Sequence, residues 1–176
     1  MNLLLSVIFI MLSLIIFILI LKNQHLQVFI KDKFYTFNVK RLYDKSKMLY
    51  LKCNTFYGQY LSKPVIFMVD TGADNNYISE KFVSEYYSDY DKHIELGDDV
   101  LSVNGKMTLN RLLDVPIQFD NGMKIKEHFT LLTETHSLDY LTSECGYKVV
   151  GILGTNFLKK YKVTINFTSM SIIAPK

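Results

Sequence analysis

The chain has 176 residues, which is enough for one domain of ordinary size with a short additional segment. Its charges nearly balance, with 20 Lys and Arg against 17 Asp and Glu, so it is neither a strongly basic nucleic-acid-binding protein nor an acidic disordered tail. Its two cysteines are too few for a disulfide framework, and no H-E-x-x-H or C-x-x-C motif predicts a metal site, so we expect no cofactor and no nucleic-acid partner.

The N-terminal segment 3–21 is apolar throughout, and Ser6 and Ser13 are its only polar residues. A helix of this length spans about 28 Å, close to the roughly 30 Å hydrocarbon core of a bilayer. No basic residue precedes the segment and no A-x-A cleavage pattern follows it. We therefore interpret residues 1–21 as an uncleaved, single-pass transmembrane anchor, and a cleaved signal peptide is the alternative.

The segment after this anchor is basic. Residues 22–52 carry eight Lys and Arg against two Asp, a net charge of +6, whereas residues 53–176 have a net charge of −3. The positive-inside rule then predicts that the C-terminal part faces the cytoplasm, with the basic stretch attracted to anionic lipid headgroups. The alternative is that these lysines are ordinary solvated residues of a first hairpin.

From Leu26 onward the pattern is typical of β-structure, and we divide the chain into a basic segment with the first strands (22–47) and a main domain (48–176). Asn104-Gly105 and Asn121-Gly122 predict turns. Helical signals are limited to 79–87 and 155–161, where Ser79 and Thr155 are candidate N-caps. Short strands with few helices predict a mostly β, small closed barrel. The predicted strands are 34–39, 49–54, 65–69, 115–119, 125–132 and 163–167.

Asp70 is the most informative residue, because it directly follows the five apolar residues 65–69. An ionisable group at the end of a buried strand costs free energy unless it is paired or hydrogen-bonded. Gly72 permits a tight turn with close backbone approach. Taken alone, the D-T-G triplet is more typical of an ordinary turn in which Asp accepts backbone hydrogen bonds.

The residues around the triplet resemble the active-site loop of the aspartic proteases, in particular the retroviral type, the retropepsins. The first motif is two apolar residues followed by Asp70-Thr71-Gly72-Ala73-Asp74. Further along, Ile152-Leu153-Gly154-Thr155-Asn156 is similar to the family's second motif, and 162–167 is similar to its last strand. The resemblance covers roughly residues 48–174. Retroviral enzymes usually have an Arg at the position of Thr155 that ties their dimer together, so we expect the dimer contact to differ.

The resemblance implies a small acid-protease (retropepsin-like) barrel that hydrolyses peptide bonds in a protein or peptide substrate. Two carboxylates share one proton in such enzymes: one activates a water molecule and the other protonates the carbonyl oxygen. The chain contains no second D-T-G and no D-S-G, so the resemblance implies a homodimer with one Asp70 from each subunit. The implied catalytic residues are Asp70, Thr71 and Gly72, and the implied substrate-binding residues are Ala73, Asp74 and Ile152.

These proteases also close a β-hairpin flap over the substrate. We expect the flap at 94–109, with Gly97, Asp98 and Asp99 near its tip and Gly105 in the returning strand. An ordinary surface hairpin is the alternative for this segment. For the whole chain, the alternative to a protease is a non-catalytic peptide-binding or dimerisation module that keeps the same fold.

Overall fold

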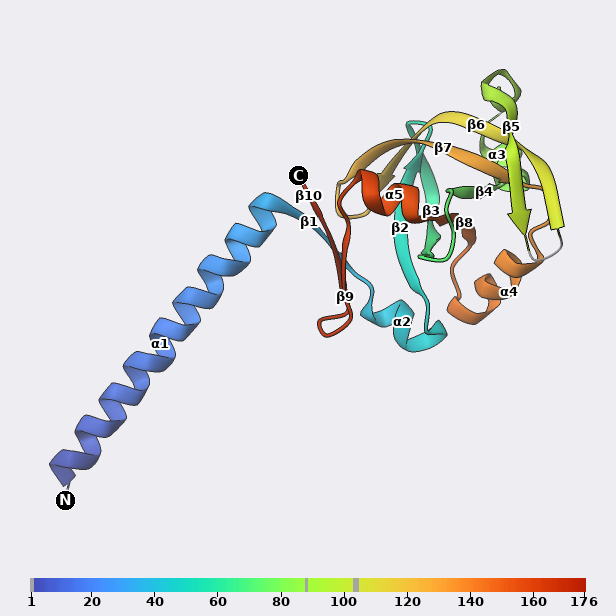
Figure 1. Ribbon diagram of the computed structural model, residues 1–176. Helices are drawn as coiled ribbons and strands as arrows, with labels where there is room; N and C mark the ends of the chain where they lie inside the picture. The colour runs from blue at the N-terminus through green and yellow to red at the C-terminus, as the bar shows by residue number, and fades with distance from the viewer. Residues whose placement is uncertain (1, 88, 103–104) are drawn as a thin grey trace. The chain divides into compact units, whose positions relative to one another are not determined.

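The computed structural model describes residues 2–87, 89–102 and 105–176 (Figure 1). The chain divides into two compact units, an N-terminal unit that ends at Phe34 and also includes Lys176, and a larger unit over Tyr35–Pro175. Each unit is described by itself below.

The N-terminal unit is one long helix, α1 (Asn2–Lys33). Its segment Met11–Phe29 is long and apolar enough to cross a membrane, and a signal sequence near an N-terminus has the same properties. The expectation that β-structure begins at Leu26 is wrong, because the helix continues to Lys33. Residues 22–33 contain neither Pro nor Gly, so nothing in them ends a helix that has already started.

The larger unit is a closed β-barrel, as the strand pattern predicts. Its sheet has the order β2-β3-β8-β4-β7-β6-β5, and β2 also pairs with β6, so that six strands close on themselves while β5 extends from β6. The bounds are β2 (Leu49–Phe56), β3 (Gln59–Val69), β4 (Tyr77–Ser79), β5 (Ile94–Ser102), β6 (Gly105–Phe119), β7 (Lys124–Leu132) and β8 (Val149–Leu153).

A smaller sheet joins the strand that follows α1 to the last two strands of the chain. It has the order β1 (Phe34–Asn38), β10 (Ser171–Pro175) and β9 (Thr164–Asn166), with Ile172 opposite Ile165. Two predicted strands, 34–39 and 163–167, are therefore confirmed in this sheet. Ile172 and Ala174 are buried in the main core, so the chain's last strand anchors this sheet to the barrel.

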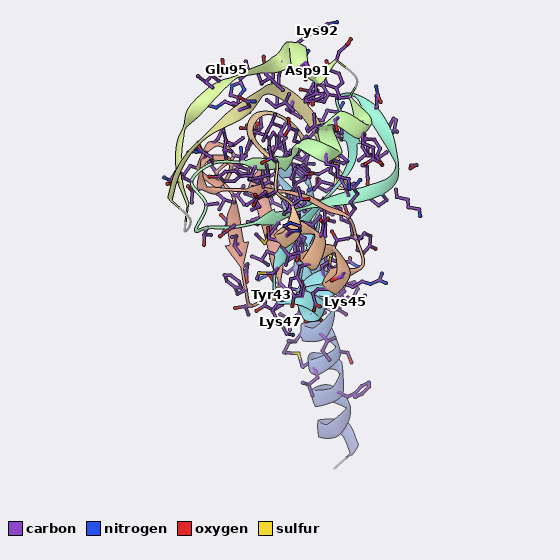
Figure 2. The ribbon with its side chains drawn as sticks, turned by 90° about the vertical axis from the view of Figure 1, so that its right-hand side faces the viewer. Tyr43, Lys45, Lys47, Asp91, Lys92 and Glu95 are labelled. Atoms are coloured by element: carbon purple, nitrogen blue, oxygen red, sulfur yellow. The ribbon has the colours of Figure 1, made fainter. Side chains whose placement is uncertain are left out.

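Among the described residues, the larger unit also has five short helical segments: α2 (Lys40–Ser46), α3 (Glu80–Tyr86), the 3-10 turn η1 (Tyr90–His93), α4 (His136–Cys145) and α5 (Thr155–Lys160). Ser79 caps α3 as predicted, because its side chain accepts a hydrogen bond from the Phe82 N–H at 3.2 Å. The N-cap of α5 is Gly154 rather than Thr155. Figure 2 shows Lys45 and Lys47 at one end of this unit and Asp91, Lys92 and Glu95 at the other.

Side chains alternate along β3 between two hydrophobic clusters. Phe67 lies in the main core inside the barrel, with Phe129 at a ring-centroid distance of 5.7 Å. Its neighbour Ile66 belongs to a second cluster, where Leu42 of α2 and Leu138 of α4 pack. Because both faces of β3 are buried, the strand needs the continuous apolar run 65–69. That run carries the chain directly to Asp70.

Candidate active site

Asp70 begins a tight turn at the end of β3. Its N–H donates to the Leu153 carbonyl at 3.1 Å, which continues the pairing of β3 with β8 by one residue. Its Oδ1 accepts a hydrogen bond from the Gly72 N–H at 2.8 Å, and its carbonyl accepts one from the Ala73 N–H at 3.4 Å. The side chain is half-buried, whereas Thr71, Gly72 and Asp74 are exposed. A carboxylate is therefore held rigidly at a surface that other molecules can reach.

Parallel pairing brings the two sequence motifs to the same edge of the barrel. β3 and β8 run parallel, with Phe67 opposite Gly151 and Val69 opposite Leu153. Parallel strands end at the same edge of a sheet, so the residues that follow Val69 and Leu153 emerge side by side. The structure thus brings together the two segments that carry the family resemblance.

Hydrogen bonds join these two segments directly. The Thr155 N–H donates to the Ala73 carbonyl at 2.7 Å, and the Asn156 N–H donates to the Asp74 carbonyl at 3.1 Å. The Thr155 hydroxyl donates to the same Asp74 carbonyl at 3.4 Å. A side-chain bond of 2.9 Å, from Asn156 Nδ2 to Asn75 Oδ1, adds a further link. The first turn of α5 therefore holds the loop that follows Asp70.

Glycine is required at both close approaches in the second motif. A Cβ atom on Gly154 would lie 2.5 Å from the Ala73 carbonyl oxygen and would also collide with that of Asn75. A Cβ atom on Gly151 would collide with the Tyr77 carbonyl oxygen. Only a residue without a side chain lets these backbones approach so closely.

Asn76 and Glu127 support the loop after Asp70 through buried hydrogen bonds, and neither residue belongs to the two sequence motifs. Asn76 is buried; its Oδ1 accepts from the Gly154 N–H at 3.0 Å and its Nδ2 donates to Glu127 Oε2 at 3.4 Å. Glu127 is only 6% exposed, forms an ion pair with Lys160 at 2.5 Å and accepts from the Tyr161 hydroxyl at 2.7 Å. Burial, together with the Glu127 hydrogen bond and charge, raises the pKa of the Tyr161 hydroxyl, so this donor keeps its proton.

One feature of the sequence indicates that Glu127 has a structural role. In β7, alternate residues point into the barrel, and Glu127 interrupts an inward series that otherwise contains Ile125, Phe129 and Leu131. A carboxylate at a buried position of such a strand needs hydrogen-bond donors or a positive charge close to it. Nothing in the sequence alone names those partners.

Ile152 lies in β8 between two neighbouring strands. It is opposite Met68 of β3 and Tyr77 of β4, is half-buried, and packs against the second hydrophobic cluster. Ile152 therefore lies beside β3, the strand that leads to Asp70. Its contact with a substrate stays a prediction.

The predicted flap region is a hairpin, but the predicted tip is wrong. β5 and β6 pair from Ile94 opposite Leu112 to Ser102 opposite Gly105. Gly97, Asp98 and Asp99 lie within β5, at a register shift between Leu96 and Asp99, and residues 103–104 lie outside the described residues. Gly97 is needed at this shift because a Cβ atom there would collide with the Leu109 carbonyl oxygen. The predicted Asn104-Gly105 turn falls partly on residue 104, which lies outside the described residues.

Comparisons with known proteins found similar chains among the solved structures only. No protein-family model matches the chain, and no curated protein matches it. Among solved structures, the chain is similar to the retroviral protease-like domain of Ddi1 from Leishmania major, with 19% identity over 69% of this chain and 82% of that chain. The TM-score is 0.47.

The Asn76 support gives a stability prediction. Replacing Asn76 by Ala leaves the Gly154 N–H and a Glu127 oxygen without their partner, and we expect the free energy of unfolding to fall by about 1–3 kcal/mol. The measurement is urea unfolding of the full chain in detergent micelles. The control is Asn110→Ala, at an exposed position of β6, which should change stability by less than about 0.5 kcal/mol. Equal effects of the two variants would contradict the proposed support.

Proposed function

We propose that this chain is a membrane-anchored, retropepsin-like aspartic endopeptidase whose active site is completed by a second copy of the chain. The observation that carries the proposal is the placement of Asp70: a half-buried carboxylate at the end of a core strand, in a turn bonded to the second motif through the Leu153 carbonyl and the Ala73–Thr155 contact. Rigid placement of this kind is what a proton-transferring group needs.

The chemistry requires two such carboxylates. One takes a proton from a water molecule that attacks the peptide carbonyl, and the other, which carries the shared proton, donates it to the carbonyl oxygen. The chain contains one D-T-G and no D-S-G, so the second carboxylate has to come from another subunit. A twofold axis next to Asp70 would place the two carboxylates together, with Thr71 and Gly72 of each chain beside them.

Exposure of the neighbouring residues supports the proposed substrate contacts. Gly72 and Asp74 are exposed, and Ala73 and Ile152 are half-buried, so their surfaces are available to a peptide. The β5–β6 hairpin is the proposed flap, and Leu96 on β5 is 80% exposed, an apolar side chain without cover in the single chain. In this proposal Gly97, Asp98 and Asp99 belong to the first strand of the flap and not to its tip.

The membrane part of the proposal rests on α1 and its flanking charges. Met11–Phe29 is a candidate membrane span, and the stretch that follows the predicted anchor 3–21 carries the net charge of +6. We propose a single-pass anchor with the barrel in the cytoplasm. Anchoring would also favour dimers, because confinement to a surface raises the effective concentration of the subunits.

The first functional prediction concerns Asp70 itself. Asp70→Asn keeps the shape of the side chain but cannot share a proton, so cleavage of a peptide library by the full chain should fall at least about 100-fold. Asp89→Asn removes the same charge at an exposed position and should leave cleavage unchanged. Cleavage at the wild-type rate by a folded Asp70→Asn chain would exclude the protease and leave a peptide-binding or dimerisation module.

The second prediction concerns assembly. If only the dimer is active, the specific activity of a fragment over residues 35–176 should fall when its concentration drops below the dimer dissociation constant. The full chain in proteoliposomes should resist dilution. Sedimentation measured at the same concentrations checks the mass. A monomer whose activity does not depend on concentration would refute the shared site.

The third prediction concerns topology. Added protease should leave the barrel unit intact in whole cells and should digest it once the membrane is permeabilised. Digestion in intact cells would reverse the proposed orientation. Release of a shorter soluble form lacking the first residues would show that the apolar helix is a signal sequence.

A further inference from the structure

A cavity far along the barrel wall from the D-T-G turn has no role in the proposed reaction. β2 has a bulge between Cys53 and Thr55, where its pairing with both β3 and β6 shifts register. Beyond the bulge, a tight turn at Tyr57 and Gly58 connects β2 to β3, and the φ angles of these two residues are 52° and 77°. A cavity of about 290 Å³ opens between this hairpin and strands β6 and β7. Its size is close to the lower end of small-molecule sites.

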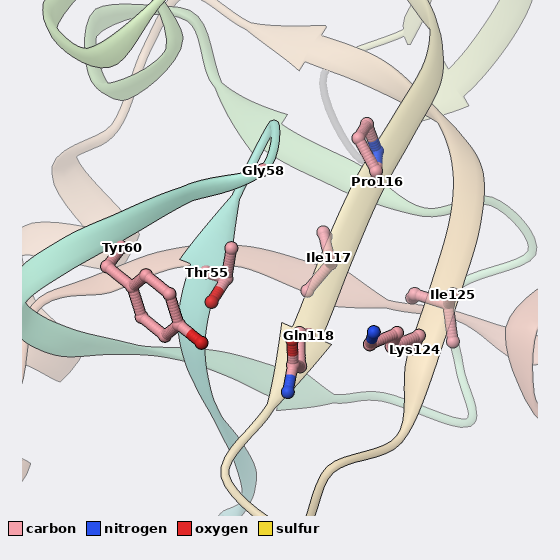
Figure 3. Close-up of a pocket in the computed structure, with 8 residues that line it drawn as sticks. All are labelled: Thr55, Gly58, Tyr60, Pro116, Ile117, Gln118, Lys124 and Ile125. Carbon is pink, nitrogen blue, oxygen red and sulfur yellow. The ribbon is translucent and has the colours of Figure 1, made fainter.

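Thr55 gives this cavity an unsatisfied hydroxyl. The residue is 7% exposed, and its Oγ1 is buried without a hydrogen-bond partner among the described residues. Thr55 stands opposite Tyr60 on β3 and Gln118 on β6, and all three line the cavity. Figure 3 shows the Thr55 hydroxyl directed into the space next to Tyr60 and Gln118. A buried hydroxyl without a partner is costly, and a ligand that bonds to it removes that cost.

Lys124 brings a positive charge to the same cavity. It reaches in from β7, and Figure 3 shows its ammonium end pointing toward Gln118. No carboxylate among the described residues forms an ion pair with it, whereas Lys126, two residues along the same strand, pairs with Asp114 at 3.3 Å. The remaining wall is apolar and is formed by Pro116, Ile117 and Ile125.

We propose that this cavity binds a carboxylate attached to a small aliphatic group. The carboxylate would accept hydrogen bonds from the Lys124 ammonium, the Thr55 hydroxyl and the Gln118 amide, all of which are donors. The aliphatic group would lie against Pro116, Ile117 and Ile125. The same chemistry occurs in a free short-chain carboxylic acid and in the C-terminal carboxylate of a peptide that ends in an aliphatic residue. The site does not depend on the proposed protease activity.

The experiment titrates the full chain in detergent micelles and follows backbone amide NMR signals. The probes are 4-methylpentanoate and N-acetyl-leucine, each with its neutral amide as the matched control. We expect saturable shifts at residues of this cavity for an acid, and binding by its amide weaker by about tenfold or more. Tighter binding of N-acetyl-leucine identifies a peptide C-terminus as the ligand, and tighter binding of 4-methylpentanoate identifies a free acid. Absence of saturation, or equal binding of acid and amide, overturns the proposal.

Variants separate the site from general charge effects. Lys124→Gln and Thr55→Val should each weaken acid binding by about tenfold or more, whereas Lys126→Gln removes a charge from the same strand and should leave it unchanged. Thr55→Val also removes a hydroxyl that has no partner in the free protein, so its melting temperature should equal or exceed that of the wild type. A lower melting temperature would show that the hydroxyl is already satisfied, and this result, or unchanged binding by Lys124→Gln, would overturn the proposal.

Discussion

The close backbone packing at Gly154 is the constraint on which the candidate site depends. At this point the end of β8 passes so near the loop 73–75 that a Cβ atom would collide with two carbonyl oxygens. The same approach allows the Thr155 and Asn156 N–H groups to bond to the Ala73 and Asp74 carbonyls. Since β3 and β8 are also paired up to Asp70, the carboxylate has little freedom to move away from the position that the barrel sets.

A buried network of hydrogen bonds inside the barrel supports the close packing at Gly154. Asn76 connects the Gly154 N–H to Glu127, and Glu127 is in turn neutralised by Lys160 and bonded to Tyr161. A buried carboxylate is stable only when partners of this kind surround it. Thr71, Gly72 and Asp74 are exposed, so they are available to the proposed partner subunit or substrate. Stability and proposed chemistry therefore use different side chains of one short loop.

The sequence predicted the parts of the fold that local chemistry determines. The apolar run 65–69, the D-T-G turn and the Ser79 cap are all present, because each depends on neighbouring residues only. Helix α4 was missed: its ten residues bury only Leu138 and Cys145, and Gly146, with φ of 74°, was its only clear stop signal. The partners of Glu127 come from other elements, and the Gly97 register shift depends on Leu109 of the facing strand. No local pattern reports such distant contacts.

Mixing active and inactive subunits tests the two-chain active site most directly. Wild-type chain and Asp70→Asn chain are exchanged in detergent micelles at constant total concentration, and peptide cleavage is measured as a function of the wild-type fraction. If each active site needs Asp70 from both chains, activity falls with the square of that fraction, to about one quarter in an equal mixture. Mixing with the Asp89→Asn chain should cause no loss. A linear decrease, to about one half in the equal mixture with Asp70→Asn, would show that each chain acts alone with its own Asp70 and would contradict the shared active site.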